Sequence, residues 1–129
     1  MRYHSLTTEM IQLAGRKARQ HGHSYVGSAH LLLAMTTQSG EAGQLLRSAG
    51  IKPELTETMT QLLYGVGVSG LPLPQGLSGE ARAILSEAAG EARRQNSREI
   101  LPLHVLLALT RQEETTAGQL LTLSGVSQQ

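Results

Sequence analysis

The chain has 129 residues, 40% of them hydrophobic and 16% charged, so it has enough apolar side chains for one folded domain and lacks the charge of a disordered protein. Aromatic residues make up only 2% of the chain, which favours a core of packed helices over a β-sandwich. The net charge of +1 is too low for a protein that binds nucleic acid mainly through phosphates, and the absence of cysteine excludes disulfides and thiolate chemistry.

The sequence carries no signal for a membrane span or for secretion. No apolar run approaches the roughly 18 residues that a membrane span requires. The polar start MRYHS lacks the apolar centre of a secretory signal peptide. We therefore expect a cytoplasmic protein with no membrane partner.

The first two helices are predicted by apolar periodicity and by the residues at their ends. Apolar residues at spacings of three and four give one stripe over 6–18, and Gly22 ends this helix. A second helix carries the leucine-rich run 30–35 and closes at Gly40. Ser28 is expected to cap its start, because a serine hydroxyl accepts a backbone N–H of the first turn.

Two further helices and a linker complete the first half of the chain. The third helix covers 42–48 and ends at Gly50, a residue suited to a left-handed C-terminal position. Pro53 suits the first turn of a fourth helix, whose apolar face continues to Leu63. The segment 65–76, GVGVSGLPLPQG, is predicted to be a linker because glycine and proline interrupt helices.

The second half of the chain predicts three helices. An apolar stripe over 81–92 indicates the fifth helix, Pro102 opens the sixth, and the seventh covers 117–123. Gly125 occupies the place of Gly50, but only four residues follow it, so no eighth helix is predicted.

The two halves are copies of one another. The run HLLLAMT at 30–36 recurs as HVLLALT at 104–110, and AGQLL at 42–46 recurs letter for letter at 117–121. Two ordered blocks of matches, separated by a single-residue slip, indicate an internal duplication. The predicted organisation is one all-α domain, 1–129, with repeat one at 3–64, the linker at 65–76 and repeat two at 77–129.

The stretch from Gly22 to Ala34, GHSYVGSAHLLLA, resembles the repeat signature of the Clp amino-terminal domain, G-H-x-Y-I-G-T-E-H-L-L-L-A. This resemblance implies two repeats of four helices that pack about a pseudo-two-fold axis. It also implies a place at the front of Clp AAA+ unfoldases, the ATPase rings that feed proteins to a peptidase or disaggregate them. The second repeat keeps Ile100 and His104 of the signature but loses its glycines and its tyrosine.

Two departures from the family pattern bear on binding. Some members dock phosphorylated arginine through an acidic residue just before the signature histidine, where this chain has Ala29 and Leu103. Without a carboxylate to hold the guanidinium, we do not expect recognition of that type. The family also places an aromatic residue beside a peptide-binding groove ahead of each first helix, where this chain has Tyr3 and Leu77. A hydrophobic staple onto the following helix explains these two side chains equally well.

No pattern of residues predicts catalysis or a cofactor. The chain has no G-x-x-x-x-G-K-[ST] phosphate loop, no aspartate and no G-x-S-x-G turn, so neither nucleotide hydrolysis nor a nucleophilic triad is expected in this segment. His4, His21, His23 and His30 lack the spacing of a metal site. His30 and His104 are instead expected to be structural, with each imidazole bonded to backbone groups between helices.

Basic residues gather near the ends of the first and fifth helices, and two explanations of them remain open. Cations stabilise helix C-termini through the helix dipole, which is the favoured explanation. The alternative is docking of an acidic partner surface or of the ATPase ring. The residues are Arg16, Lys17, Arg19, Arg93, Arg94 and Arg98.

The predicted function is protein binding: the domain recruits substrates or adaptors to a Clp-type ATP-dependent unfoldase or protease, whose ATPase ring lies in the same longer chain. The alternative is a stand-alone regulatory protein that lacks an ATPase, and a helical DNA-binding module is disfavoured by the low net charge. A dimer is one way to cover the face left by a missing eighth helix. The candidate contact residues are Tyr3, Ser5, Leu6, Leu77, Ser78 and Arg82.

Overall fold

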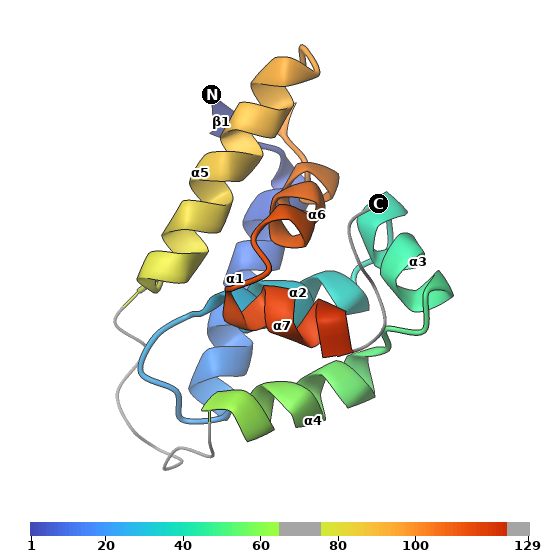
Figure 1. Ribbon diagram of the computed structural model, residues 1–129. Helices are drawn as coiled ribbons and strands as arrows, with labels where there is room; N and C mark the ends of the chain where they lie inside the picture. The colour runs from blue at the N-terminus through green and yellow to red at the C-terminus, as the bar shows by residue number, and fades with distance from the viewer. Residues whose placement is uncertain (65–75, 124–129) are drawn as a thin grey trace.

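The computed structural model describes residues 1–64 and 76–123 (Figure 1). Within these ranges the regular secondary structure is almost entirely helical, which confirms the all-α prediction. In chain order the elements are β1 (Arg2–Tyr3), α1 (Ser5–Gln20), α2 (Ser28–Thr37), α3 (Glu41–Ser48), α4 (Pro53–Tyr64), α5 (Gly79–Arg94), β2 (Glu99–Ile100), α6 (Pro102–Arg111) and α7 (Thr116–Leu123).

The second helix of repeat one is the centre of the molecule. Helix α2 packs against α1, α3, α4, α5, α6 and α7, and its residues from Ser28 to Thr36 are all buried (Figure 1). A helix that is apolar on every side must be surrounded by other elements. The run from Leu31 to Met35 supplies this apolar surface, so the leucine-rich signature is the core itself.

Two short parallel backbone pairings join the two repeats. In β1, Tyr3 pairs in parallel with Ile100 of β2, and at the matching place Val26 pairs with Leu77. Each pairing joins the entry to one repeat's first helix with the segment before the other repeat's second helix. This exchange is what a pseudo-two-fold arrangement predicts, and it sets the start of α1 near the end of α5.

The start of α2 differs from the sequence prediction. The N-cap residue is Gly27, and Ser28 makes no capping bond to its own helix. The Gly27 backbone N–H donates to Nδ1 of His30 at 2.8 Å instead. The prediction of Ser28 as the cap is therefore wrong, because the Ser28 hydroxyl donates to Glu80 and accepts from the Ala117 N–H instead.

The glycine of the duplicated block AGQLL allows each short third helix to pack closely on the backbone before it. Gly43 in α3 and Gly118 in α7 lie against the backbone that ends the preceding helix. A methyl group at Gly43 would overlap the Gln38 carbonyl oxygen, and one at Gly118 would overlap the Gln112 carbonyl oxygen. Only glycine permits this close approach, which brings each short helix against its predecessor.

The predicted linker and the last six residues of predicted repeat two lie partly or wholly outside the described residues. Of the linker, only Gly76 is described, and its φ of 110° is the left-handed conformation that favours glycine. Helix α7 is followed by residues 124–129, which also lie outside the described ranges. Among the helices that the structure describes, none is long and apolar enough to cross a membrane.

Candidate functional site

Two clefts open where the repeats meet, one at the start of α1 and the other at the start of α5. The first, which we call the apolar cleft, has a volume of about 120 Å³. The second, which we call the polar cleft, has a volume of about 580 Å³. Their linings match across the pseudo-two-fold: Leu6 in the apolar cleft corresponds to Glu80 in the polar cleft, 74 residues later.

Aliphatic side chains from two elements line one part of the apolar cleft, and residues 38–43, with the polar side chains of Gln38, Ser39 and Glu41, line the rest. Leu6 comes from the first turn of α1, and Leu101, Pro102 and Leu103 come from the start of α6. The Gln38 side-chain amide donates to the Leu6 carbonyl oxygen at 2.9 Å, so this backbone oxygen is already satisfied. The cleft therefore offers apolar surface, and an apolar side chain can enter it without leaving Leu6 O unpaired.

A carboxylate organises the polar cleft. Oε1 of Glu80 accepts a hydrogen bond from the Ser28 hydroxyl at 2.9 Å and from the Thr116 backbone N–H at 3.0 Å. The Ser28 oxygen in turn accepts from the Ala117 N–H at 3.0 Å. Glu80 and Ser28 together satisfy the start of α7 from two other helices, so the Glu80 charge is engaged in holding the repeats together.

A chain of imidazoles forms one wall of the polar cleft. Nδ1 of His30 accepts the Gly27 N–H, so the proton of the neutral ring is on Nε2, which lies 2.7 Å from Nδ1 of His23. Burial, with the nearby His23 and His21 as further causes, lowers the pKa of His30 to about 3. His30 is therefore neutral at physiological pH, and its bond to the Gly27 N–H is the backbone contact that the sequence predicts.

The other signature histidine repeats this arrangement with one change. Nδ1 of His104 accepts the Leu101 N–H at 2.9 Å, and its Nε2 lies 3.2 Å from Oε1 of Gln95. Burial lowers the pKa of His104 as well. The prediction that both histidines bond backbone groups is confirmed, and only the partner of Nε2 differs between the repeats.

The predicted contact residues fall into two groups at opposite ends of the domain. Three lie at the start of α1 and three at the start of α5, and the strand pairings keep these two helix starts apart. Leu6 lines the apolar cleft and Ser78 lines the polar cleft, where Ser78 also caps α5 by accepting the Ala81 N–H. Tyr3 is 38% exposed, Leu77 is half-buried against the core, and Ser5 and Arg82 are exposed.

Ala29 and Leu103 are the residues directly before the two signature histidines. Ala29 is fully buried inside α2, and Leu103 is half-buried in the wall of the apolar cleft. Neither side chain can pair with a guanidinium. Leu103 therefore contributes an aliphatic side chain to the apolar cleft at a position where some family members have a carboxylate.

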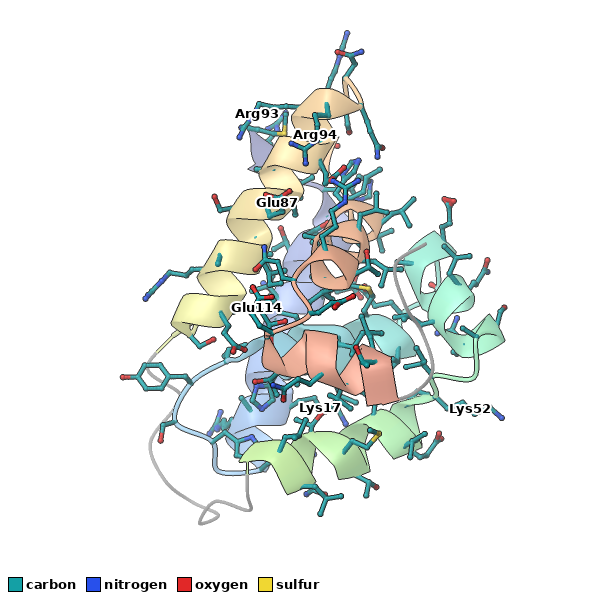
Figure 2. The ribbon with its side chains drawn as sticks, viewed as in Figure 1. Lys17, Lys52, Glu87, Arg93, Arg94 and Glu114 are labelled. Atoms are coloured by element: carbon teal, nitrogen blue, oxygen red, sulfur yellow. The ribbon has the colours of Figure 1, made fainter. Side chains whose placement is uncertain are left out.

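The basic residues near the helix ends are partly paired. Nζ of Lys17 lies 3.5 Å from Oε1 of Glu57 in α4, and Nη2 of Arg94 lies 2.8 Å from Oε1 of Glu91. Figure 2 shows Lys17 beside α4, and Arg93 and Arg94 at the end of α5. Lys17, Arg19, Arg93 and Arg94 fall in last helical turns, as the helix-dipole explanation expects, whereas Arg98 lies beyond the end of α5.

The histidine that follows α1 is bonded to α4. His21 is held by α4, with Nδ1 at 2.8 Å from Nε2 of Gln61 and Nε2 at 2.9 Å from Oε2 of Glu57. Within residues 1–64 and 76–123, no group of three or more His, Cys, Asp or Glu side chains has the geometry to hold a metal ion.

The family model of the Clp repeat (R) N-terminal domain matches this chain twice, over residues 2–75 and 76–129. The chain belongs to this family of Clp N-terminal repeat domains. The two matches divide the chain within the segment that the sequence marks as a linker.

Curated relatives match most of this chain but only a small part of themselves. The chain is 28% identical over 121 residues to the ATP-dependent Clp protease ATP-binding subunit ClpA homolog of Brassica napus, with 93% of this chain and 14% of that protein covered. It is likewise 28% identical to the chaperone protein ClpC1 of Arabidopsis thaliana, covering 93% of this chain and 13% of that one. Both relatives are named as chloroplastic.

Solved structures share the fold. The N-terminal domain of ClpD from Arabidopsis thaliana superimposes with a TM-score of 0.79 at 19% identity, over 98% of this chain and 86% of that chain. The Hsp104 N-terminal domain from Candida albicans gives a TM-score of 0.73 at 23% identity, over 98% and 84%. These likenesses confirm the two-repeat helical architecture.

Proposed function

We propose that this domain recruits proteins, as substrates or through adaptors, to a Clp-type ATPase ring in the same longer chain. The observation that carries the proposal is the apolar cleft, which is open at the start of α1 and lined by Leu6, Pro102 and Leu103. The membership in the Clp repeat family and the named functions of the relatives support it. The proposed compartment is the cytoplasm.

The cleft suits a single apolar side chain of an unfolded segment or of an adaptor. Leu6, Leu101, Pro102 and Leu103 supply its aliphatic part, and Gln38, Ser39 and Glu41 line its polar part. Complete burial of one leucine-sized side chain contributes about 2 kcal/mol, so binding by one such contact is weak and reversible. Such weak binding is sufficient for recruitment, because a tethered weak site raises the local concentration of a client near the ring.

The remaining contact residues form the rim of the two helix starts. Tyr3 projects a half-exposed ring next to the start of α1, where the exposed hydroxyl of Ser5 follows. At the start of α5, Leu77, Ser78 and Arg82 have the corresponding positions. We propose that the α1 end provides most of the affinity, since the apolar cleft lies there.

Fluorescence anisotropy with labelled, unfolded casein tests this proposal. The variant Tyr3→Ala, Leu6→Ser is expected to weaken binding by about tenfold, which corresponds to about 1.4 kcal/mol. The variant Leu77→Ala, Arg82→Ala is expected to lose less. Leu62→Ala is the matched control, because Leu62 is 78% exposed on α4 and away from both clefts.

Each variant must unfold at the same temperature as the wild type before its binding is compared. Absence of casein binding by the wild type, or equal losses in the α1 variant and in Leu62→Ala, would contradict recruitment through the apolar cleft.

A further inference from the structure

The apolar cleft has two walls of different chemistry. Leu6 and residues 101–103 supply aliphatic side chains, whereas residues 38–43 carry the polar side chains, among them the Glu41 carboxylate. The two walls lie close together, since a Cβ atom added at Gly40 would lie 3.9 Å from Cδ1 of Leu6. A ligand side chain that lies against Leu6 therefore brings its neighbours along the ligand chain close to Glu41.

The Glu41 carboxylate is available to a cation from outside the domain. Glu41 is exposed in the first turn of α3, and no residue within 1–64 and 76–123 forms an ion pair or a hydrogen bond with its carboxylate. Arg47, the cation of the same helix, donates through Nη1 to the Thr36 carbonyl oxygen at 2.7 Å and to the Gln38 carbonyl oxygen at 2.8 Å. This guanidinium is therefore engaged with the backbone that precedes α3.

The second repeat shows that the fold does not require this carboxylate. In the alignment of the two AGQLL blocks, the counterpart of Glu41 is Thr116. The carboxylate of the polar cleft belongs to Glu80, whose Oε1 accepts from the Ser28 hydroxyl and the Thr116 N–H. The dipole of α3 favours a negative charge in its first turn, but it leaves the hydrogen-bond acceptors of Glu41 unused. Of the two cleft carboxylates, Glu80 joins helices and Glu41 is left for a ligand.

We propose that the apolar cleft selects segments in which an aliphatic side chain lies next to lysine or arginine. The aliphatic side chain packs against Leu6 and Leu103, and the adjacent cation pairs with the Glu41 carboxylate. A segment with an acidic residue in that place is disfavoured, because it sets two carboxylates against each other. This selectivity rests on the proposed function, since it names the class of segment that the same cleft recruits. An exposed ion pair contributes modestly, so a preference of about threefold is expected.

The probes are three acetylated and amidated peptides, GSLKSG, GSLESG and GSSKSG. Each is titrated into the ¹⁵N-labelled full chain up to about 10 mM, the range of weak contacts, and the amide signals of Leu6, Glu41 and Leu103 are followed by NMR. GSLKSG is expected to bind about threefold more tightly than GSLESG. GSSKSG is expected to bind at least about tenfold more weakly than GSLKSG, since it lacks the aliphatic side chain. The preference for lysine is expected to shrink in about 0.5 M salt, which screens exposed charges.

Three chain variants assign the preference to Glu41. Glu41→Gln is expected to remove the difference between GSLKSG and GSLESG, and Glu41→Lys is expected to reverse it. Glu54→Lys is the matched control, because Glu54 is also an exposed glutamate in the first turn of a helix and does not line the apolar cleft. It makes the same change in net charge and is expected to leave the preference as in the wild type. Hydrogen-exchange protection of the core helices checks that each variant is folded.

The outcomes separate this selectivity from recruitment itself. Equal binding of GSLKSG and GSLESG at the cleft would overturn the role of Glu41 and leave recruitment by the apolar cleft standing. A preference that persists in Glu41→Gln, or that Glu54→Lys changes as much as Glu41→Lys does, would overturn it as well and would assign the effect to the overall charge. The absence of shifts at the cleft with both leucine peptides would overturn the selectivity and the proposed function together.

Discussion

Repeat one and repeat two share a backbone plan and differ in what surrounds it. Both place a histidine three residues after a helix cap, and both use a glycine to bring the third helix against its predecessor. Yet repeat one buries its second helix from Ser28 to Thr36, whereas repeat two leaves part of α6 in solvent. A duplicated sequence therefore gives equivalent helices, while the burial of identical residues such as Leu33 and Leu107 depends on which other helices pack on them.

The largest difference is expected between Leu33→Ala and Leu107→Ala. Leu33 is fully buried, so its truncation is expected to cost about 4 kcal/mol of unfolding free energy. Leu107 is half-buried, and its truncation is expected to cost about 1.5 kcal/mol. Urea denaturation measures both values. Equal losses would show that the two faces are equally packed.

The duplicated glycines offer the next test, because here the two repeats are expected to behave alike. Gly43→Ala and Gly118→Ala are each expected to cost about 3 kcal/mol, since the new methyl group meets a backbone carbonyl that cannot move aside. Gly15→Ala is the control: nothing lies within 4 Å of the added carbon, and alanine is expected to stabilise α1 by up to about 1 kcal/mol. Tolerance of alanine at either duplicated glycine would contradict the close approach.

Acid is expected to affect the two signature histidines unequally. The folded pKa of His30, about 3, lies below its ordinary value of 6.5, so the neutral ring stabilises the fold above pH 6.5. That stability is lost as the pH falls from 6.5 toward 3, by about 2 kcal/mol between pH 7 and pH 5. Urea denaturation at a series of pH values measures the loss.

His30→Gln is the matched variant for the pH series, because glutamine does not titrate there. Its stability is expected to change less between pH 7 and pH 5 than that of the wild type. His104→Gln is expected to flatten the profile in the same direction, since burial also lowers the pKa of His104. An unchanged profile in His30→Gln would refute the buried neutral imidazole.

The smallest difference is expected between two serines at helix starts, Ser28 at the start of α2 and Ser78 before α5. Ser28→Ala removes the bonds to Glu80 and to the Ala117 N–H, which join three helices, and is expected to cost about 2 kcal/mol. Ser78→Ala removes one ordinary N-cap and is expected to cost about 1 kcal/mol. Thermal unfolding compares them, and a reversed order would mean that Ser28 contributes little to the junction.

Local signals in the sequence predicted the helices well. Apolar spacing, glycines and prolines located all seven described helices, since these features act within a few residues. The roles of His30 and His104 were predictable as well, because an imidazole near a helix start reaches the cap backbone. The repeat arithmetic also predicted the internal duplication, and the family resemblance implied the pseudo-two-fold packing of the two halves.

What the sequence could not predict depends on residues that are distant along the chain. Serine is a residue type that N-caps prefer, but the partners of Ser28 in the structure, Glu80 and Ala117, lie 52 and 89 residues away. The difference between the clefts follows from Leu6 against Glu80, and the repeat alignment places these two residues at matching positions. Their different roles depend on the helices beside them, which are α6 for Leu6 and α2 and α7 for Glu80.

Photo-crosslinking from the two exposed tyrosines tests recruitment most directly. Tyr3 lies beside the start of α1, near the apolar cleft, and Tyr25 lines the polar cleft, at 38% and 48% exposure. Each is replaced in turn by p-benzoylphenylalanine, and labelled unfolded casein is added before irradiation. Recruitment through the apolar cleft predicts a casein adduct from position 3 that exceeds the adduct from position 25 and that excess unlabelled casein removes. Equal adducts, a stronger adduct from position 25, or none at either position would contradict it.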